Sequence, residues 1–287
     1  MPSFRKLLYN DSKPLVVPGV YDAIGARIAQ KVGFKAMFQT GYGTSATLLG
    51  MPDYGFIGST ETVENARRIC QAVSVPVIVD ADTGYGNPLS VWKLVRELEA
   101  AGASGIFLED QKWPKRCGHM TGKEVITKEE YAEKLRAALD ARKNKDFIIV
   151  ARTDARAPEG LDSAIERGLE YKKNGADAIF VEAPKSIAEM KKIGQSINAP
   201  LVANMIEGGA TPLLSATKLH EMGFKLILYP LSILFANAFA SLQILRELRK
   251  SGTTARFKKN LVLFEQFNDI VDLAKFRKME KKYAHKI

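Results

Sequence analysis

The sequence predicts an α/β fold in which a parallel sheet closes into a (β/α)8, or TIM, barrel. Short runs of Val, Ile, Leu and Phe alternate with polar loops and amphipathic segments along most of the chain, which is typical of parallel strands covered by helices. The strand interiors are almost continuously apolar, as expected when both faces are buried. Eight such runs occur in 287 residues, a length that suits one barrel of about 250 residues and an extension.

Each strand is predicted from a short apolar run that ends in a polar or glycine-containing turn. In chain order these strands are Leu15–Val20, Lys35–Gln39, Val75–Asp80, Gly105–Glu109, Phe147–Arg152, Ala178–Glu182, Pro200–Asn204 and Leu226–Tyr229.

Each helix is predicted from apolar residues that recur three or four positions apart. Ser90 and Thr127 are the expected N-caps of two of them, and Glu130 completes a capping box with Thr127. Gly follows several helices, where a left-handed residue commonly ends the element. The predicted helices are Asp22–Lys31, Glu61–Ala72, Val91–Ala101, Lys128–Arg142, Leu161–Lys173, Ile187–Ile197 and Ser215–Met222.

The C-terminal part predicts a helical extension beyond the barrel. The stretch Leu231–Leu245 is apolar but contains polar residues. It is too short for a membrane span of about 20 residues, so we expect a buried helix. Residues 251–287 are basic yet retain apolar positions, and we expect them to dock on the barrel or on a neighbouring subunit. The predicted domains are a catalytic barrel over 1–250 and an extension over 251–287.

Composition narrows the class of protein. The chain is 46% hydrophobic and carries a net charge of +10, but its Lys and Arg residues are spread over many helices and no nucleic-acid-binding motif occurs, so we expect no nucleic-acid partner. Two Cys, one of them Cys70 on an apolar helix face, predict no disulfide framework. Residues 1–14 contain no apolar signal segment; a cytoplasmic protein without a membrane anchor is expected.

Polar side chains follow consecutive predicted strands. In a barrel, catalytic groups gather at the carboxyl ends of the strands. A single Asp there is commonly a solvated loop residue, but the joint pattern indicates a site. These residues are Asp80, Asp82, Glu109, Asp110, Arg152, Asp154, Glu182 and Asn204.

The acidic members predict a divalent metal site. Asp53, Asp80, Asp82 and Glu109 offer only oxygen ligands, which suit Mg²⁺, or Mn²⁺, better than Zn²⁺. Arginines such as Arg152 and Arg116 offer bidentate recognition of carboxylates. This combination favours chemistry on a di- or tricarboxylate that passes through an enolate-like state.

The segment Lys115–His119 places Cys117 between Arg116 and His119. Neighbouring cations lower a thiol pKa, so we expect Cys117 to act as an acid or base near neutral pH. The alternative is a solvated basic loop with an incidental Cys.

A second glycine-containing segment, Gly41–Ala46, matches the dinucleotide pattern G-x-G-x-x-A. Gly50 and the Met51–Pro52 pair interrupt the helix that this pattern requires. We therefore interpret the segment as a loop whose backbone N–H groups face an anionic substrate.

Together these residues resemble the isocitrate lyase/phosphoenolpyruvate mutase superfamily, and within it the methylisocitrate lyase-like branch. The resemblance runs from about residue 17 to 252. Its most specific pieces are Val79–Gly86, Glu109–Gln111, Lys115–His119, Ala151–Ala155 and Gly209–Pro212.

The resemblance implies site roles for individual residues and a homo-oligomer, a dimer or tetramer, in which the last barrel helix is exchanged between subunits. Mg²⁺ is expected at Asp80, Asp82, Glu109 and Asp53. The implied catalytic residues are Cys117, Arg152, Glu182 and His119. The implied substrate-binding residues are Thr40, Gly41, Tyr42, Lys115, Arg116, Gly118, Arg152, Glu182 and Asn204.

The implied reaction is cleavage of a C–C bond in 2-methylisocitrate, or a related 2-hydroxy polycarboxylate, to a 2-oxo acid and succinate, with Cys117 protonating the enolate. Two positions depart from that branch: Phe38 stands where Tyr is usual and Phe235 where Arg is usual. A missing Arg favours a smaller substrate, such as a 2-alkylmalate or oxaloacetate. Trp113–Pro114 resembles carboxyphosphonoenolpyruvate mutases, so phosphonate chemistry and a catalytically silent binding barrel are the remaining alternatives.

Overall fold

The computed structural model describes residues 2–10, 12–120 and 122–284 and confirms the predicted barrel. Its parallel strands pair in chain order, and β8 pairs with β1, so the sheet closes. The strands are β1 (Leu15–Val20), β2 (Met37–Gln39), β3 (Val77–Asp80), β4 (Gly105–Glu109), β5 (Ile148–Thr153), β6 (Ala178–Val181), β7 (Leu201–Asn204) and β8 (Phe224–Tyr229).

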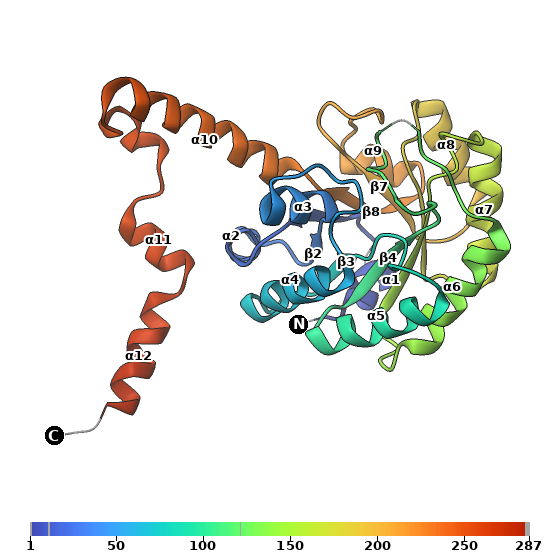
Figure 1. Ribbon diagram of the computed structural model, residues 1–287, viewed down its shortest axis with the longest axis horizontal. Helices are drawn as coiled ribbons and strands as arrows, with labels where there is room; N and C mark the ends of the chain where they lie inside the picture. The colour runs from blue at the N-terminus through green and yellow to red at the C-terminus, as the bar shows by residue number, and fades with distance from the viewer. Residues whose placement is uncertain (1, 11, 121, 285–287) are drawn as a thin grey trace.

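Helices surround the barrel, as Figure 1 shows, and three of them continue into an arm. They are α1 (Phe4–Asn10), α2 (Ala23–Val32), α3 (Gly41–Leu49), α4 (Ser59–Ala72), α5 (Pro88–Ala101), α6 (Lys128–Ala141), α7 (Leu161–Lys173), α8 (Ile187–Ser196), α9 (Ala216–Glu221), α10 (Ser232–Ser251), α11 (Phe264–Ile270) and α12 (Leu273–Tyr283), with a 3₁₀ helix η1 (Ala255–Asn260). No helix in the described ranges is long and apolar enough to cross a membrane.

The predicted ranges of the barrel elements agree with the structure to within a few residues. Thr127 caps α6 as predicted, since its side chain accepts a hydrogen bond from the Glu130 N–H. The predicted cap of α5 at Ser90 was wrong. Asn87 caps this helix, because Pro88 is suited to the first helical position and starts the helix earlier.

Two apolar layers hold the barrel together. Outward-facing strand residues pack against α4 to α9, whereas inward-facing residues form a separate cluster inside the barrel. Three phenylalanines pack edge to face across that interior: ring centroids are 5.0 Å apart for Phe38 and Phe107, and 5.9 Å apart for Phe107 and Phe180. Aromatic pairs prefer this geometry, and these rings give the barrel a firm floor beneath the strand ends.

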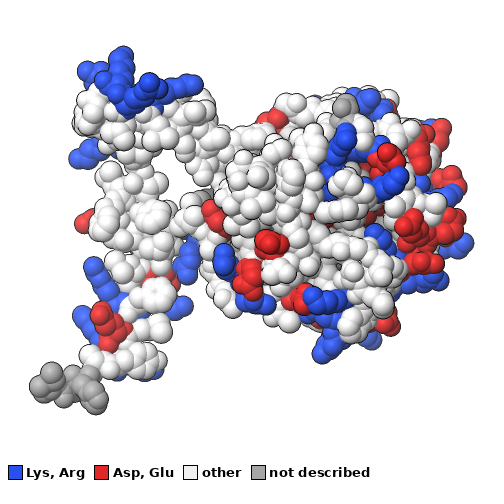
Figure 2. Space-filling view, viewed as in Figure 1, with Lys and Arg blue, Asp and Glu red and all other residues white. Residues whose placement is uncertain are grey.

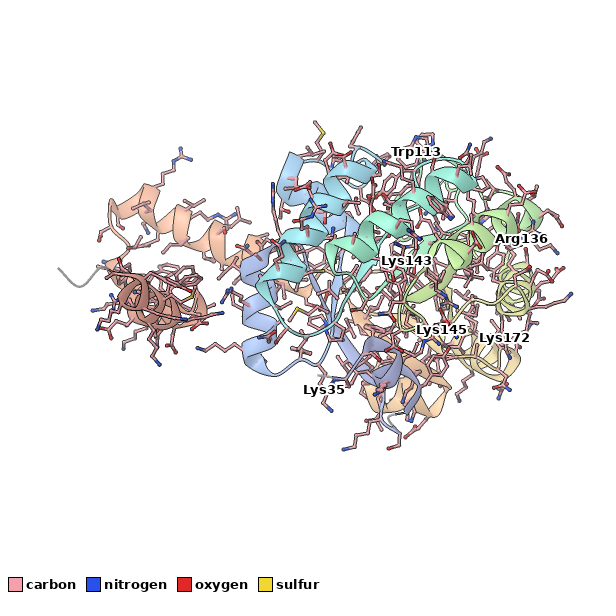
Figure 3. All side chains as sticks on the ribbon, turned by 90° about the horizontal axis from the view of Figure 1, so that it is seen from below. Lys35, Trp113, Arg136, Lys143, Lys145 and Lys172 are labelled. Carbon is pink, nitrogen blue, oxygen red and sulfur yellow. The ribbon has the colours of Figure 1, made fainter. Side chains whose placement is uncertain are left out.

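The amino-terminal end of the barrel is closed by α1, which was not among the predicted helices. Phe4 and Leu8 of α1 are buried within the inner cluster. Arg5 forms a 2.6 Å ion pair with Asp177, at the start of β6. Figure 3 shows Trp113, which follows β4, at the end of the barrel opposite Lys35, which precedes β2. The open end is therefore the one where the polar strand ends gather.

The arm formed by α10, η1, α11 and α12 leads away from the barrel (Figure 1). The prediction that Leu231–Leu245 is buried was wrong for a single chain, because no residue of α10 is buried. Phe239 is 66% and Leu245 61% exposed. Figure 2 shows Lys and Arg gathered at the far end of α10 and a largely uncharged surface between them and the barrel. The extension contacts the barrel through α11 and α2, where Lys31 and Asp269 pair at 3.0 Å.

Closure of β1 against β8 depends on a glycine. A Cβ at Gly19 would lie 2.1 Å from the Pro230 carbonyl oxygen, and that backbone cannot move without opening the barrel. We expect Gly19→Ala to lower the free energy of unfolding by about 2 kcal/mol or more, measured by urea denaturation. Gly25→Ala in α2 is the control, because only the Asp22 carboxylate lies nearby, at 3.0 Å. Equal stability of Gly19→Ala and the wild type would contradict this account.

Candidate active site

A cavity opens at the carboxyl ends of the strands, above the three phenylalanines. It brings together most of the predicted site residues from seven of the strand ends and from the loop after β4. The lining residues are Phe38, Thr40, Tyr42, Asp53, Asp80, Phe107, Cys117, Gly118, Arg152, Phe180, Glu182, Asn204, Ile206, Leu228, Pro230 and Leu231.

One side of the cavity is a cluster of carboxylates around an ammonium group. Lys115 is buried, and its Nζ lies 2.5 Å from Asp53 Oδ1 and 2.6 Å from Asp82 Oδ1. Asp82 is buried, and burial, together with Asp80 and Asp53, raises its pKa to about 7 although Lys115 opposes the shift. Carboxylates this close repel one another, so the cluster attracts positive charge.

Glu109 and Arg152 stand side by side at the ends of β4 and β5, which pair in register. Arg152 Nε lies 3.3 Å from Glu109 Oε2. Burial raises the pKa of Glu109 well above its ordinary value, although Arg152 opposes this. The other oxygen, Oε1, is buried without a hydrogen-bond partner among the described residues. A buried oxygen of this kind is costly and is free to accept from a ligand.

Asp154 fixes the orientation of Arg152. Arg152 donates from Nε to Asp154 Oδ2 at 2.8 Å and from Nη2 to Oδ1 at 3.1 Å. Burial alone would raise the pKa of Asp154, but Arg152 and Lys123 outweigh it and lower the pKa. Asp154 is thus a permanent anion that holds the guanidinium in one plane, as bidentate pairs do. Part of the charge of Arg152 is thereby already offset before any substrate arrives.

Glu182, at the end of β6, is held by His119 and Asn204. His119 Nε2 lies 3.2 Å from Glu182 Oε1, and Asn204 Nδ2 donates to the same oxygen at 3.2 Å. His119 Nδ1 accepts from the Ala210 N–H at 3.0 Å, which fixes the ring with Nε2 directed toward Glu182. Burial alone would raise the pKa of Glu182, but Arg152 and His119 lower it.

The expectation that cations lower the thiol pKa of Cys117 was wrong. Burial, with smaller contributions from the carboxylates of Asp53 and Glu182, raises that pKa to about 11, because the hydrogen bond from the backbone at His119 and the charge of Arg152 are too weak to reverse the shift. The reason is that Arg116 points elsewhere. It lines a separate cavity with Trp113 and Gly122, and its guanidinium lies 5.8 Å from the centre of the Tyr54 ring. Cys117 is therefore a protonated thiol at neutral pH.

The interpretation of Gly41–Ala46 as a loop was also wrong, since these residues begin α3. Thr40 caps this helix by accepting from the Gly43 N–H at 3.4 Å, and the interruptions after Gly50 come only where the helix has ended. The Gly41 N–H donates to Asp80 Oδ2 at 3.3 Å. The amino end of α3, with its partial positive charge, therefore faces the acidic cluster and the cavity.

Phe38 and Phe235, the two residues that depart from the methylisocitrate lyase-like pattern, lie in different parts of the structure. Phe38 lines the cavity floor, so the usual Tyr hydroxyl is replaced by an apolar edge. Phe235 lies on α10 and is 41% exposed, outside the cavity that the described residues form. Sequence reasoning missed the apolar wall formed by Ile206, Leu228 and Leu231, because apolar residues at strand ends are indistinguishable from core by pattern.

A divalent cation fits this donor set. Among residues 2–10, 12–120 and 122–284, no three His, Cys, Asp or Glu side chains are placed to ligate one ion directly. The acids are nevertheless all oxygen donors, and Glu109 Oε1 has no partner. Mg²⁺ commonly keeps several waters and takes only one or two carboxylates. The arrangement therefore suits Mg²⁺ held largely through water.

Comparisons with known proteins agree with this site. A family model described as phosphoenolpyruvate phosphomutase matches residues 4–249. The chain is 46% identical over 280 residues to 2,3-dimethylmalate lyase from Eubacterium barkeri, covering 98% of this chain and 96% of the relative. It is 40% identical to a 2-methylisocitrate lyase from Aeropyrum pernix, covering 95% and 87%.

Among solved structures, oxaloacetate acetylhydrolase in complex with 3,3-difluorooxalacetate superposes with a TM-score of 0.93 at 32% identity, covering 98% of this chain and 95% of that one. The family match spans the whole barrel, and the relatives are named lyases and mutases. The chain therefore belongs to the phosphoenolpyruvate phosphomutase family, within the phosphoenolpyruvate mutase/isocitrate lyase superfamily, and is a carbon–carbon lyase of that group.

Proposed function

We propose that this enzyme cleaves the C2–C3 bond of an alkyl-substituted malate to give a 2-oxo acid and a monocarboxylate. One observation carries the choice of substrate: Arg152 is the single cationic side chain among the described residues that line the cavity, and much of the remaining lining is apolar. A dicarboxylate with alkyl groups matches both features. A third carboxylate would be buried without a partner, which is unfavourable.

The relative named 2,3-dimethylmalate lyase, at 46% identity, supports the same choice. The second candidate is 2-methylisocitrate, which the sequence analysis placed first and which relatives such as that of Aeropyrum pernix favour. Its third carboxylate would need a cation from outside the cavity of one chain. At position 235, where the resemblance to methylisocitrate lyases implies an Arg, this chain has Phe.

The residues divide the chemistry between them. Arg152 pairs with one substrate carboxylate while Asp154 keeps its guanidinium fixed. The amino end of α3, beginning at Gly41, directs its partial positive charge toward the other end of the substrate. Mg²⁺ held by Asp80, Asp82, Glu109 and Asp53 would supply the positive charge that stabilises the oxyanion when C2 becomes a carbonyl.

Cys117 completes the reaction as an acid. When the C2–C3 bond breaks, its electron pair stays on the fragment that becomes an enolate, and C3 must gain a proton. A thiol whose pKa burial has raised to about 11 holds that proton at neutral pH. Its pKa is still far below that of a carbon acid, so transfer to the enolate is downhill. The C2 hydroxyl loses its proton as the carbonyl forms, and the thiolate regains one proton after the products leave, so the enzyme ends the cycle in its starting state.

The substrate assignment predicts an order of kcat/KM values. We expect 2,3-dimethylmalate to be cleaved at least about tenfold more efficiently than 2-methylisocitrate, because an unpaired buried carboxylate costs 1.4 kcal/mol or more. The measurement is release of 2-oxo acid with Mg²⁺ and again with EDTA, which should abolish it. A reversed order would favour the tricarboxylate, and turnover of a phosphonate alone would replace the lyase assignment.

Cys117→Ser should lower kcat at least about a hundredfold in the same assay, whereas Cys70→Ser, on a helix outside the barrel, should leave kcat unchanged. Comparing the two variants distinguishes loss of the proposed catalytic acid from a general effect of replacing a thiol.

The raised pKa of Cys117 predicts its reactivity. Below about pH 11 the folded protein carries little thiolate, which is the form that iodoacetamide attacks. We expect alkylation of Cys117 at pH 8 to be roughly a hundredfold slower than in urea, where the thiol pKa is about 8.5, and to accelerate only toward pH 11. Mass spectrometry of the Cys117 peptide measures the rate. Rapid alkylation of the folded protein at pH 8 would show that the thiol is activated instead.

We also propose that the enzyme is a homo-oligomer in which the arm packs on a second copy. The support is the exposed apolar row Phe235, Phe239, Leu242, Leu245 and Leu248 on α10, since a surface this apolar marks a contact with another molecule. We expect Phe239→Glu to shift the protein to a smaller assembly, measured by size-exclusion chromatography with light scattering. Lys191→Gln, on exposed α8, makes the same change in net charge and should not. Unchanged mass for Phe239→Glu would exclude this surface as the contact.

A further inference from the structure

The loop that carries Cys117 is folded on itself. It runs between β4 and α6, and we call its described residues, 112–120 and 122–125, the thiol loop. Its two ends are joined by an antiparallel bridge between Gln111 and Val125 and by a 2.9 Å hydrogen bond from the Lys112 N–H to the Glu124 carbonyl. Near its middle, the Cys117 N–H donates to the Asp53 carbonyl at 3.1 Å. The loop therefore lies over the cavity as a closed hairpin.

Its tip rests directly on two substrate-binding side chains. A Cβ at Gly118 would lie 2.3 Å from Glu182 Oε1 and 2.5 Å from Arg152 Nη2. Only a glycine permits so close an approach. The tip is thus in contact with the same Arg152 that Asp154 orients.

Lys123 links these parts. Its side chain is 1% exposed, although an ammonium group is costly to bury unless it is paired. It donates to Asp154 Oδ1 at 2.8 Å and, by a second short hydrogen bond, to the carbonyl oxygen of Gly118. One ammonium group therefore joins the residue next to Cys117 to the carboxylate that holds Arg152.

Asp154 can accept this extra donor without releasing Arg152. Its Oδ2 accepts only the Arg152 Nε–H, while Oδ1 is shared by Arg152 Nη2 and Lys123 Nζ. Its backbone N–H is fixed by Asp110 Oδ1 at 2.8 Å. Contacts that do not involve the loop therefore hold the Asp154 carboxylate in place.

We propose that Lys123 is a positioning residue that fastens the closed thiol loop to Asp154, so that Cys117 is delivered to the cavity only when Arg152 is in its binding orientation. The residue touches no reacting atom. It acts through Gly118 and Asp154, and it makes closure of the loop and orientation of the guanidinium a single event. This role rests on the proposed lyase function for its kinetic consequence but not for its effect on the loop.

The test compares Lys123→Met with Lys112→Met. Methionine keeps the length and removes the charge, and Lys112 is an exposed lysine of the same loop, paired only with Glu124. Alkylation of Cys117 by iodoacetamide at pH 8, followed by peptide mass spectrometry with and without Mg²⁺, reports loop opening without any turnover. We expect at least about a tenfold faster reaction for Lys123→Met and the wild-type rate for Lys112→Met. An unchanged rate for Lys123→Met, or equal acceleration by both variants, overturns the proposal.

A double-mutant cycle tests whether Lys123 acts through Asp154 or only through the Gly118 carbonyl. If Lys123 acts through Asp154, Lys123→Met and Asp154→Asn have non-additive effects on the alkylation rate. Additive effects would mean that Lys123 acts only through the Gly118 carbonyl and would refute the link to Arg152.

On 2,3-dimethylmalate, Lys123→Met should lower kcat about tenfold or more with a smaller change in KM. Faster alkylation without lyase activity in the wild type would refute the proposed function and leave the loop anchor intact. Lys123→Gln serves if the Met variant does not fold.

Discussion

The site depends on one constraint: more carboxylates than cations are buried at the mouth of a closed barrel. Lys115 stands between Asp53 and Asp82, and Arg152 is shared by Glu109 and Asp154. Each ammonium or guanidinium offsets some of the repulsion, yet the pKa of Asp82 still rises to about 7. A buried anionic cluster of this kind stays ionised only when positive charge is added. The folded chain therefore provides an electrostatic environment that suits the proposed divalent cation.

The same constraint explains why the Cys117 thiol is protonated. A loop that closes over buried carboxylates brings its cysteine among negative charges and away from water, and both effects favour the neutral thiol. Sequence order placed Cys117 beside Arg116, but neighbours in sequence on a loop point in different directions. Arg116 faces Tyr54, whereas Cys117 faces Asp53 and Glu182. The charge pattern in the sequence therefore predicted a lowered pKa for the Cys117 thiol, whereas the fold raises it.

The barrel and the strand-end residues were predictable because periodicity and strand polarity determine them. Eight buried parallel strands place Asp80, Glu109, Arg152 and Glu182 at one rim whatever the details of packing. The sequence pattern could not predict contacts between segments that are distant in the chain. Nothing in the local sequence distinguishes Lys123 from a surface lysine, and only the fold brings it within 2.8 Å of Asp154. The interpretation of Gly41–Ala46 as a loop was wrong for a different reason. The residues that break a helix lie after the end of α3, so they do not prevent it from starting at Gly41.

In the proposed reaction, selectivity would follow from how little positive charge the cavity presents. Arg152 is already paired with Asp154 through two hydrogen bonds, so its remaining capacity matches one carboxylate. The amino end of α3 and a bound cation can serve a second. Beyond these, the described lining is aromatic and aliphatic, from Phe38 across to Leu228 and Leu231. Such a wall gains from burying methyl groups, about 0.8 kcal/mol for each carbon, and gains nothing from another charge. The scarcity of positive charge would limit the number of carboxylates in the proposed substrate, and the apolar surface would favour alkyl groups on it. A change in either feature should therefore alter which 2-hydroxy acid the barrel accepts.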